Sequence, residues 1–473
     1  MLRSCALFVV SCALLLPVAA RAATPPVDSV AVRVDRYLAR CTGLGRFSGA
    51  VLVARGDAVW LRRGYGWADV ERRTPFTPDT PQEVASVSKM FTAMAALKLR
   101  DRGRLALDDS LAMWLPGCPG TWRGITIREL IHHTSGIPDY EEALEIGSPR
   151  YMQWMGRRDA ADRIMADAAR KPLDFVPGTK FHYSNTGYIV LARVVERVAR
   201  QPFADFVTRE LLRPAGMTHS GVFDGGAGPA GLAKGYTYED LGWARMLAGV
   251  ALDDGHLKPV PHLLLAPPIG DAELYSTVGD LLRWSRVMDG GALVPASEAA
   301  EVFTPGLENY GFGWFIDHAF DRTRYRHNGV LPGHLTDFIK FPDESLTIVL
   351  VSNLDRTRMD RVARDVSAIV LGTPYDPPVY GVVDSLTTTR IAALDGDYAM
   401  SDGTPLKVRF DPPMLVAELK DHYTAGLIPL GPTEFYMPLG DGRAIFTLGP
   451  DGRAIRVNMR YSGEDHVAER VAR

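Results

Sequence analysis

The chain has 473 residues, which is enough for two or three domains with well-developed cores. Apolar residues make up 46% of it and charged residues 23%, a balance typical of folded globular protein rather than of disordered chain. The formal net charge of −3 gives no support to a nucleic-acid-binding function, which would require a basic surface.

The first 22 residues have the pattern of a secretory signal peptide. Arg3 precedes an apolar run over residues 6–18, and "ARA" at 20–22 supplies small residues for cleavage. We therefore expect residues 1–22 to be removed and the protein to be exported, as a periplasmic or secreted protein. Lipoprotein-type cleavage before Cys12 is a weaker alternative, because the apolar run continues beyond it. No later stretch is long and apolar enough to predict a membrane span.

Two cysteines, Cys41 and Cys118, follow this segment. Export would permit a disulfide between them, although one bridge would not make a disulfide-stabilised scaffold. Nothing in the sequence places the two residues near each other, so their pairing stays open.

The first part of the chain combines one β-hairpin with several helices. Residues 30–39 are predicted to be helical, and "FSGAVLVARGDAVWLRRGYG" (47–66) indicates two strands around an Arg-Gly-Asp turn. Apolar periodicity predicts further helices over 88–102, 187–200 and 276–291. Thr126 and Glu129 have the spacing of a capping box at the start of another helix.

Residues 310–353 change to β character. "YGFGWFI", "RYRHNGV" and "TDFIKFPDESLTIVLVSN" predict strands, with a hairpin turn at Pro342-Asp343. Strands without helical crossovers pair antiparallel, so the simplest closure brings the N-terminal hairpin beside them. The predicted fold class is mixed α+β: an antiparallel sheet flanked by helices, with a mainly helical region.

The C-terminal part is predicted to be a separate all-β domain. "GTPYDPPVYG" is rich in Pro and Gly, and residues 371–384 are assigned as a linker. Six short strands, beginning with "PLKVRF" and ending with "AIRVNMRY", alternate with turns over residues 385–473. Strands of this length and spacing predict a small barrel or sandwich.

A serine and a lysine stand three residues apart at the start of the 88–102 helix, in "SVSK". Ser86 and Lys89 would share one face of a helix, so Oγ and Nζ can meet. A serine hydroxyl needs a base to become a nucleophile, and burial can lower the pKa of a lysine enough for it to serve. The alternative is that Ser86 or Ser88 only caps the helix.

Two further short motifs carry polar side chains. In "YSN", Tyr183 can relay a proton and Asn185 can hydrogen-bond a substrate amide; the alternative is an ordinary turn before a helix. In "HNG", Gly329 allows close backbone approach, and the N–H of Val330 could join that of Ser86 as oxyanion donors. His327 could instead be a buried structural histidine.

Taken in order, Ser-x-x-Lys, Tyr-x-Asn and His-x-Gly resemble the serine β-lactamase and penicillin-binding-protein superfamily. "ITIRELIHHTSGIPDY", "YSTVGDLLRW", "YGFGW" and other flanking segments share the resemblance, which covers roughly residues 30–370. The nearest branch holds class C β-lactamases, DD-peptidases, D-aminopeptidases and β-lactamase-like esterases. The resemblance implies a serine hydrolase domain over 28–370, and residues 385–473 resemble the lipocalin-like domains appended to such enzymes.

The resemblance also implies roles for the motif residues. Ser86 would be the nucleophile, Lys89 its activating base and Tyr183 a general acid/base, with Asn185 positioning the substrate. His327 replaces the Lys of the family's Lys-Thr-Gly motif. A largely neutral imidazole gives up a cation that helps to hold the carboxylate of a β-lactam.

These observations predict an exported serine hydrolase that forms an acyl-enzyme on small ester or peptide/amide substrates. D-aminoacyl peptidase or weak β-lactamase activity is an alternative, and so is a non-catalytic protein that binds cell-wall peptides. No cofactor is predicted. His132 and His133 are adjacent, not spaced as metal ligands, so no metal site is predicted either. The sequence does not indicate an oligomeric state.

Overall fold

The computed structural model describes residues 27–143, 157, 159–223, 228–238, 257–260, 270–375, 387–411, 414–419, 423–437, 442–461 and 464–471. The predicted signal peptide lies outside the described residues, and the predicted linker falls on them only up to residue 375. Within these ranges, every helix is too short or too polar to cross a membrane.

The main sheet has six antiparallel strands in the order β10-β11-β12-β13-β1-β2. Their bounds are β1 Gly49–Arg55, β2 Ala58–Tyr65, β10 Phe315–Ala319, β11 Arg322–Leu331, β12 His334–Phe341 and β13 Leu346–Ser352. β1 pairs with β2 on one side and with β13 on the other. The predicted closure of the N-terminal hairpin against the later strands is therefore confirmed.

The first strand of this later group begins five residues after the predicted start. Residues 310–314 do not continue β10, and Gly313 has a φ of 78°, a left-handed conformation that interrupts an extended strand. A Cβ at Gly313 would lie 2.7 Å from the Cα of Met90. The break thus lets this turn pack directly on the helix that follows Ser86.

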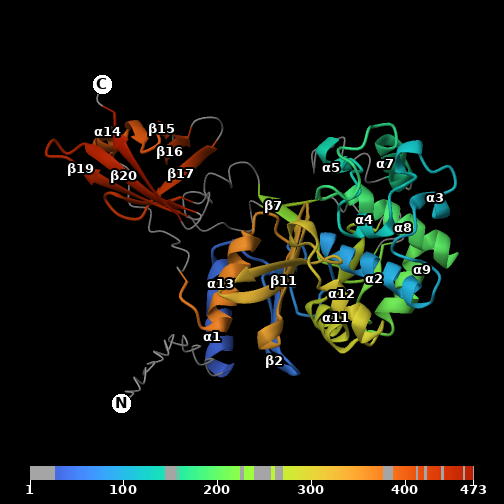
Figure 1. Cartoon of the computed structure of the whole chain (residues 1–473). Helices are drawn as coiled ribbons and strands as arrows, with labels where there is room; N and C mark the ends of the chain where they lie inside the picture. Colours follow the sequence, from blue (N-terminus) through green and yellow to red (C-terminus); the bar gives the residue numbers. More distant parts are fainter. Residues whose placement is uncertain are drawn as a thin grey trace, which may run out of the picture.

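Helices cover both faces of the sheet. α1 (Val27–Gly43) and α13 (Met359–Leu371) lie on one face, and α2 (Ser88–Asp101) and α11 (Val278–Gly290) lie on the other (Figure 1). Alternate residues of β1 serve the two cores: Leu52 belongs to the α2 side, and Val51 and Val53 belong to the α1 side. Burial on both faces explains why β1 is an unbroken apolar run.

This unit also contains shorter helices, single turns and short strands. The helices are α3 Leu111–Trp114, α4 Ile127–Ile131, α5 Tyr140–Ala143, α7 Ala160–Ala168, α8 Asn185–Ala199, α9 Phe203–Val207 and α12 Ala296–Val302, with single turns η1 Ala85–Val87, η2 Gly120–Trp122, η3 Thr208–Leu212, η5 Leu307–Asn309 and η6 Pro342–Glu344. The strands are β3 Trp67–Asp69, β4 Thr74–Pro75, β5 Gln82–Glu83, β6 Gly221–Val222, β7 Tyr236–Tyr238, β8 Leu257–Pro259 and β9 Leu274–Ser276. The predicted capping box of Thr126 and Glu129 is present at α4.

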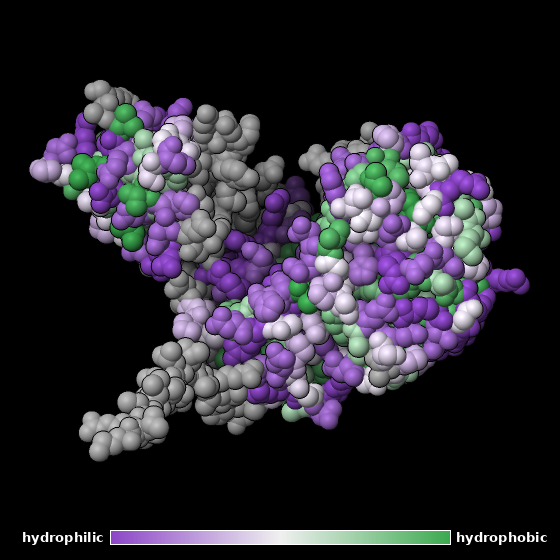
Figure 2. Space-filling model, in the orientation of Figure 1, coloured by the Kyte–Doolittle hydropathy of each residue, from purple (hydrophilic) through white to green (hydrophobic). Residues whose placement is uncertain are grey.

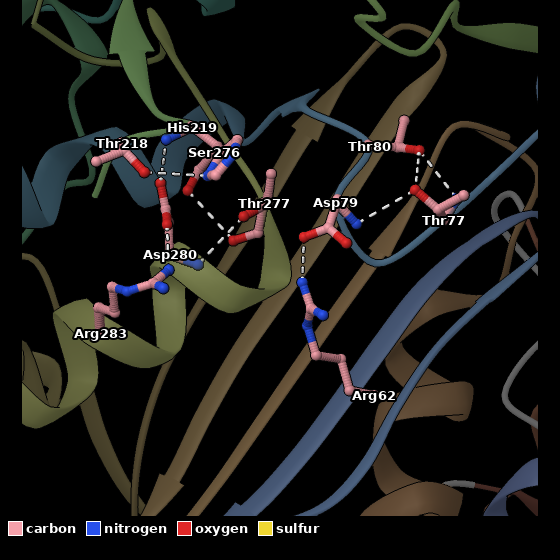
Figure 3. A network of polar contacts seen from close by, with 10 residues as sticks. All are labelled: Arg62, Thr77, Asp79, Thr80, Thr218, His219, Ser276, Thr277, Asp280 and Arg283. Atoms are coloured by element: carbon pink, nitrogen blue, oxygen red, sulfur yellow. Dashed lines mark hydrogen bonds and ion pairs between the residues drawn. The ribbon is translucent and has the colours of Figure 1, made fainter. Parts of the chain in front are cut away.

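A buried carboxylate fixes the N-terminus of α11 (Figure 3). Thr277 caps the helix by accepting a hydrogen bond from the N–H of Asp280 at 3.2 Å. The Asp280 carboxylate accepts from the N–H of His219 at 2.7 Å and from the hydroxyl of Ser220 at 2.8 Å. Ser220 also contacts Ser276 of β9 at 2.8 Å. The network ties α11 to β9, which directly follows the segment that contacts Lys89.

The C-terminal residues form a closed antiparallel barrel of strands β14 to β21. After α14 (Thr388–Leu394), the strands are β14 Gly396–Met400, β15 Pro405–Asp411, β16 Met414–Leu419, β17 Tyr423–Pro429, β18 Glu434–Met437, β19 Gly442–Leu448, β20 Ala454–Tyr461 and β21 Glu464–Arg470. Strands β14 and β21 are absent from the sequence prediction, because β14 is short and β21 is mostly polar. These two strands pair with each other and close the barrel.

Apolar side chains fill the barrel interior, among them Tyr398, Phe435 and Phe446. On the face in view, the barrel's exposed apolar residues are scattered among polar ones (Figure 2). α13 contacts the barrel through Arg361, whose Nη1 donates to the hydroxyl of Tyr436 at 3.2 Å.

Cys41 and Cys118 are not joined by a disulfide. Cys41 is buried in the core on the α1 side, whereas Cys118 packs against the core on the α2 side. The sequence left open whether these two cysteines pair. They do not, because they lie on opposite sides of the sheet.

Candidate active site

Ser86 lies in the turn η1, directly before α2. The preceding Ala85 has a φ of 51°, a left-handed conformation uncommon for a residue with a Cβ. Val87, not a serine, occupies the cap position of α2, and no side chain caps it; the hydroxyl of Ser88 instead accepts from the N–H of Leu274 at 3.0 Å. The helix-cap explanation for these serines is therefore wrong. Ser86 is half-buried, while the residues on either side are fully buried.

Lys89 is fully buried and donates three hydrogen bonds. Its Nζ lies 3.1 Å from Ser86 Oγ, 2.7 Å from Asn185 Oδ1 and 3.0 Å from the backbone oxygen of Asp271. An ammonium has three hydrogens, so all three are used. Two of the acceptors therefore fix the direction in which Lys89 points at Ser86.

The pKa of Lys89 lies above its ordinary value. Burial lowers this pKa, but Tyr183, Asp271 and Glu141 together raise it by more than burial lowers it. Burial acts on the pKa of Lys89 in the expected direction, but the groups around the lysine outweigh it. Burial meanwhile raises the pKa of Tyr183, against the opposing effect of Lys89. The pKa values of Lys89 and Tyr183 therefore depend on each other, since each group opposes the effect of burial on the other.

Asn185 is the first residue of α8, two positions earlier than the predicted helix start. Its side chain lies between Lys89 and a buried carboxylate: Nδ2 donates to Asp139 Oδ2 at 3.1 Å. Asp139 Oδ1 also accepts from the backbone N–H groups of Asn185 and Thr186, at 2.9 and 3.3 Å. Asp139 therefore binds both the start of α8 and the amide that contacts the lysine.

Tyr183 lies over the lysine and against a histidine. Lys89 Nζ is 4.9 Å from the centroid of the Tyr183 ring, which stacks on His133 with centroids 4.2 Å apart. His133 is buried, with a φ of 56°, and its Nδ1 accepts from the N–H of Ser184 at 3.0 Å. The turn at His133, for which no catalytic role was predicted, thus forms the wall behind Tyr183.

His327 is buried and both of its ring nitrogens contact protein groups. Nδ1 lies 2.7 Å from the backbone oxygen of Asn328, which can only accept, so Nδ1 carries the proton. Nε2 then accepts from the hydroxyl of Tyr310 at 3.1 Å. Burial, together with the charge of Lys89, lowers the pKa of His327 to about 3. The imidazole is therefore neutral at pH 7.

Gly329 brings strand β11 against the turn that carries Ser86. A Cβ at this position would lie 2.2 Å from the backbone oxygen of Val84 and 3.1 Å from the Cβ of Ala85. Only glycine allows this approach. The contact places the backbone of residues 329–330 beside the serine turn, which is where an oxyanion pair of Ser86 and Val330 is predicted. The side chain of Val330 itself is half-exposed.

A group of buried or half-buried acids lies behind the lysine and was not predicted from the sequence. The hydroxyl of Tyr140 lies 3.1 Å from Asp271 Oδ2 and 3.3 Å from Glu141 Oε1. Burial raises the pKa of Asp271 to about 6, and that of Glu141 to about 7. Glu273, in the same segment as Asp271, is buried with its pKa raised to about 7. No spacing rule connects these residues with Lys89, because three separate segments supply this region.

Among the described residues, His, Cys, Asp and Glu side chains do not assemble in threes as metal ligands would. The structure brings together Ser86, Lys89, Tyr183, Asn185, His327 and Gly329, which lie far apart along the chain in three short motifs.

Comparison with known proteins gives a consistent result. The Beta-lactamase family description matches residues 34–371. Penicillin-binding protein 4* of Bacillus subtilis (strain 168) is 28% identical over 425 residues, covering 86% of this chain and 91% of the relative. The octameric penicillin-binding protein homologue from Pyrococcus abyssi superposes with a TM-score of 0.64 at 20% identity, covering 93% and 99% of the two chains.

A D-amino acid amidase from Ochrobactrum anthropi SV3 superposes with a TM-score of 0.61 at 19% identity, over 72% of this chain and 99% of the amidase. At 20% and 19% identity, the two superposed structures establish the fold alone. The family match establishes membership, because it spans most of the chain. The chain belongs to the Beta-lactamase family of serine hydrolases.

Proposed function

We propose that this protein is an exported serine hydrolase that forms an acyl-enzyme at Ser86, with small esters or amides, including peptides, as substrates. The observation that carries the proposal is the contact between the buried Lys89 Nζ and Ser86 Oγ, held from behind by Asn185 and Asp271. A lysine that only stabilised the fold would not need to point at a half-exposed hydroxyl.

The proposed reaction begins when the Lys89–Tyr183 pair has lost one proton. Ser86 Oγ then bonds to the substrate carbonyl carbon, and its proton passes to the pair. When the carbon–leaving-group bond breaks, the leaving alcohol or amine takes that proton. Water repeats the sequence on the acyl-enzyme and releases the acid. Backbone N–H groups of Ser86 and Val330 are proposed to hold the oxyanion.

Esters and amides are favoured over β-lactams by the state of His327. The imidazole is neutral, and both of its nitrogens already contact Asn328 and Tyr310. It therefore offers no cation to a β-lactam carboxylate. The superposed Ochrobactrum anthropi enzyme is, by its name, an amidase for D-amino acids, and amides of this kind belong to the proposed substrate class.

A fluorophosphonate probe tests the nucleophile. Wild-type protein should gain one phosphonyl adduct, located by peptide mass spectrometry on the peptide that contains Ser86. The Ser86→Ala variant should gain none, with Ser88→Ala as the matched control. Equal labelling of Ser86→Ala, or an adduct on another peptide, would refute the assignment. An unlabelled wild type would instead favour a non-catalytic peptide-binding protein.

A substrate panel then defines the class. Hydrolysis of p-nitrophenyl acetate, of a D-alanine amide and of nitrocefin should be compared, with Ser86→Ala as the blank. We expect kcat/KM to be lowest for nitrocefin.

Export rests on residues 1–22 alone, and fractionation of the expressing cells, with N-terminal sequencing of the mature chain, would test it.

A further inference from the structure

The amide of Asn185 has only one orientation that satisfies its neighbours. An ammonium can only donate, so the atom of Asn185 that faces Lys89 at 2.7 Å must be Oδ1. Nδ2 then faces Asp139 Oδ2 at 3.1 Å, where a carboxylate accepts. The donor–acceptor pattern runs in one direction from Lys89 through Asn185 to Asp139.

Asp139 is itself fixed from the other side. Its Oδ1 accepts from the N–H groups of Asn185 and Thr186 at the first turn of α8. The residue is 6% exposed, so these contacts are not shared with bulk solvent. Since both backbone donors bind Oδ1, Oδ2 remains for the side-chain amide.

We propose that Asp139 is a positioning residue for the base: it orients the Asn185 amide so that an oxygen, rather than an N–H, faces Lys89. This inference rests on the proposed function, because it assigns Asp139 to the lysine that would activate Ser86. Asp139 acts through Asn185 and need not touch the substrate.

The consequence of replacing Asp139 by Asn follows from hydrogen counting. The backbone donors of α8 would retain the oxygen of the new amide, so its NH₂ group would face Asn185. Two NH₂ groups cannot satisfy each other, and the Asn185 amide would turn over. An N–H would then point at the Lys89 ammonium, which loses an acceptor and is destabilised as a cation.

Other charged and titratable groups also face Lys89, and the test must leave them unchanged. They are Tyr183, Tyr188, Glu141, Asp271, His133 and His327. Substitutions confined to positions 139 and 185 alter none of these side chains. Asp139 itself raises the pKa of Glu141 and of Asp271, so the pH at which the Lys89–Tyr183 pair loses its proton reports on the amide orientation when the total charge at positions 139 and 185 is kept, as in the exchange variant below.

The test measures the rate of fluorophosphonate labelling of the full chain from pH 5 to pH 10. For Asp139→Asn we expect at least a tenfold lower plateau rate, and a midpoint of the acid limb lowered by about one pH unit. The exchange variant Asp139→Asn/Asn185→Asp restores the donor–acceptor pattern and moves a carboxylate onto Lys89. Its midpoint should lie above that of wild type.

Ser184→Ala is the matched control. Ser184 caps α8 by accepting from the N–H of Gly187 at 3.1 Å, so its loss weakens the same helix end without turning the amide. It should lower the melting temperature and leave the midpoint in place.

Two results would overturn the proposal. One is a wild-type pH profile for Asp139→Asn; the other is an exchange variant whose midpoint does not rise. If Asp139→Asn does not fold, the midpoint of the exchange variant decides. Failure of the proposed function looks different, because wild-type protein would then stay unlabelled, or the Ser86→Ala variant would be labelled as well as wild type.

Discussion

Lys89 Nζ lies 2.7 Å from Asn185 Oδ1, closer than its 3.1 Å contact with the serine that it would activate. The lysine is therefore held by a fixed amide and directed at the hydroxyl, rather than bound chiefly by it. This arrangement keeps the base in place when Ser86 is acylated and no longer available as a partner.

Replacing Lys89 by Arg should abolish most activity while retaining a positive charge. A guanidinium does not lose its proton in proteins, so it cannot act as the base. We expect kcat/KM for p-nitrophenyl acetate to fall by about 10²–10⁴-fold. Lys98→Arg, on the same helix α2, is the control and should retain activity. A near-wild-type rate for Lys89→Arg would remove Lys89 from the mechanism.

Replacing His327 by Lys should shift substrate preference toward carboxylates. A cation at this buried strand position can form a charge-assisted hydrogen bond of about 1.5–3 kcal/mol with a carboxylate. The ratio of kcat/KM for nitrocefin to that for p-nitrophenyl acetate should therefore rise about 10–100-fold. An unchanged ratio would show that charge at position 327 does not select the substrate.

Replacing Gly329 by Ala should displace the serine turn. The new Cβ would lie 2.2 Å from the backbone oxygen of Val84. A backbone atom cannot rotate out of the way as the end of a side chain could. We expect fluorophosphonate labelling to slow by at least about tenfold, with a stability loss of about 1–3 kcal/mol. Gly290→Ala, where a Cβ meets nothing within 4 Å, is the matched control. Equal behaviour of the two variants would contradict the close approach.

Glu273 should make the fold less stable as pH rises. Its pKa is raised from 4.5 to about 7 in the folded protein, so the folded state binds more protons than the unfolded state between these values. The stability that this group adds is present at low pH and is lost as pH rises through 7. From pH 5 to pH 8 the loss is about 2 kcal/mol.

The Glu273→Gln variant mimics the protonated acid and should remove that pH dependence. Urea unfolding at pH 5 and pH 8 would measure the difference, with the exposed Glu308→Gln as the control. If Glu273→Gln loses as much stability as wild type between these pH values, Glu273 does not hold a proton in the fold.

Local sequence patterns were sufficient for much of the fold. The β-rich runs of β1 and β2, the apolar periodicity of α2 and α8, and the capping box at α4 depend on neighbours within one element, and all three are confirmed. The barrel strands β14 and β21 were missed because each pairs with a strand at the other end of the domain.

The sequence by itself determined the order of three short motifs and hence the residues that meet at Ser86. Only the tertiary structure decided their chemical state. Tyr183, Asp271 and Glu141 come from three segments far apart in sequence, and together they raise the pKa of Lys89 against the effect of burial. Burial beside that lysine keeps His327 neutral. Protonation depends on burial and on charges nearby in space, and neither can be obtained from spacing along the chain.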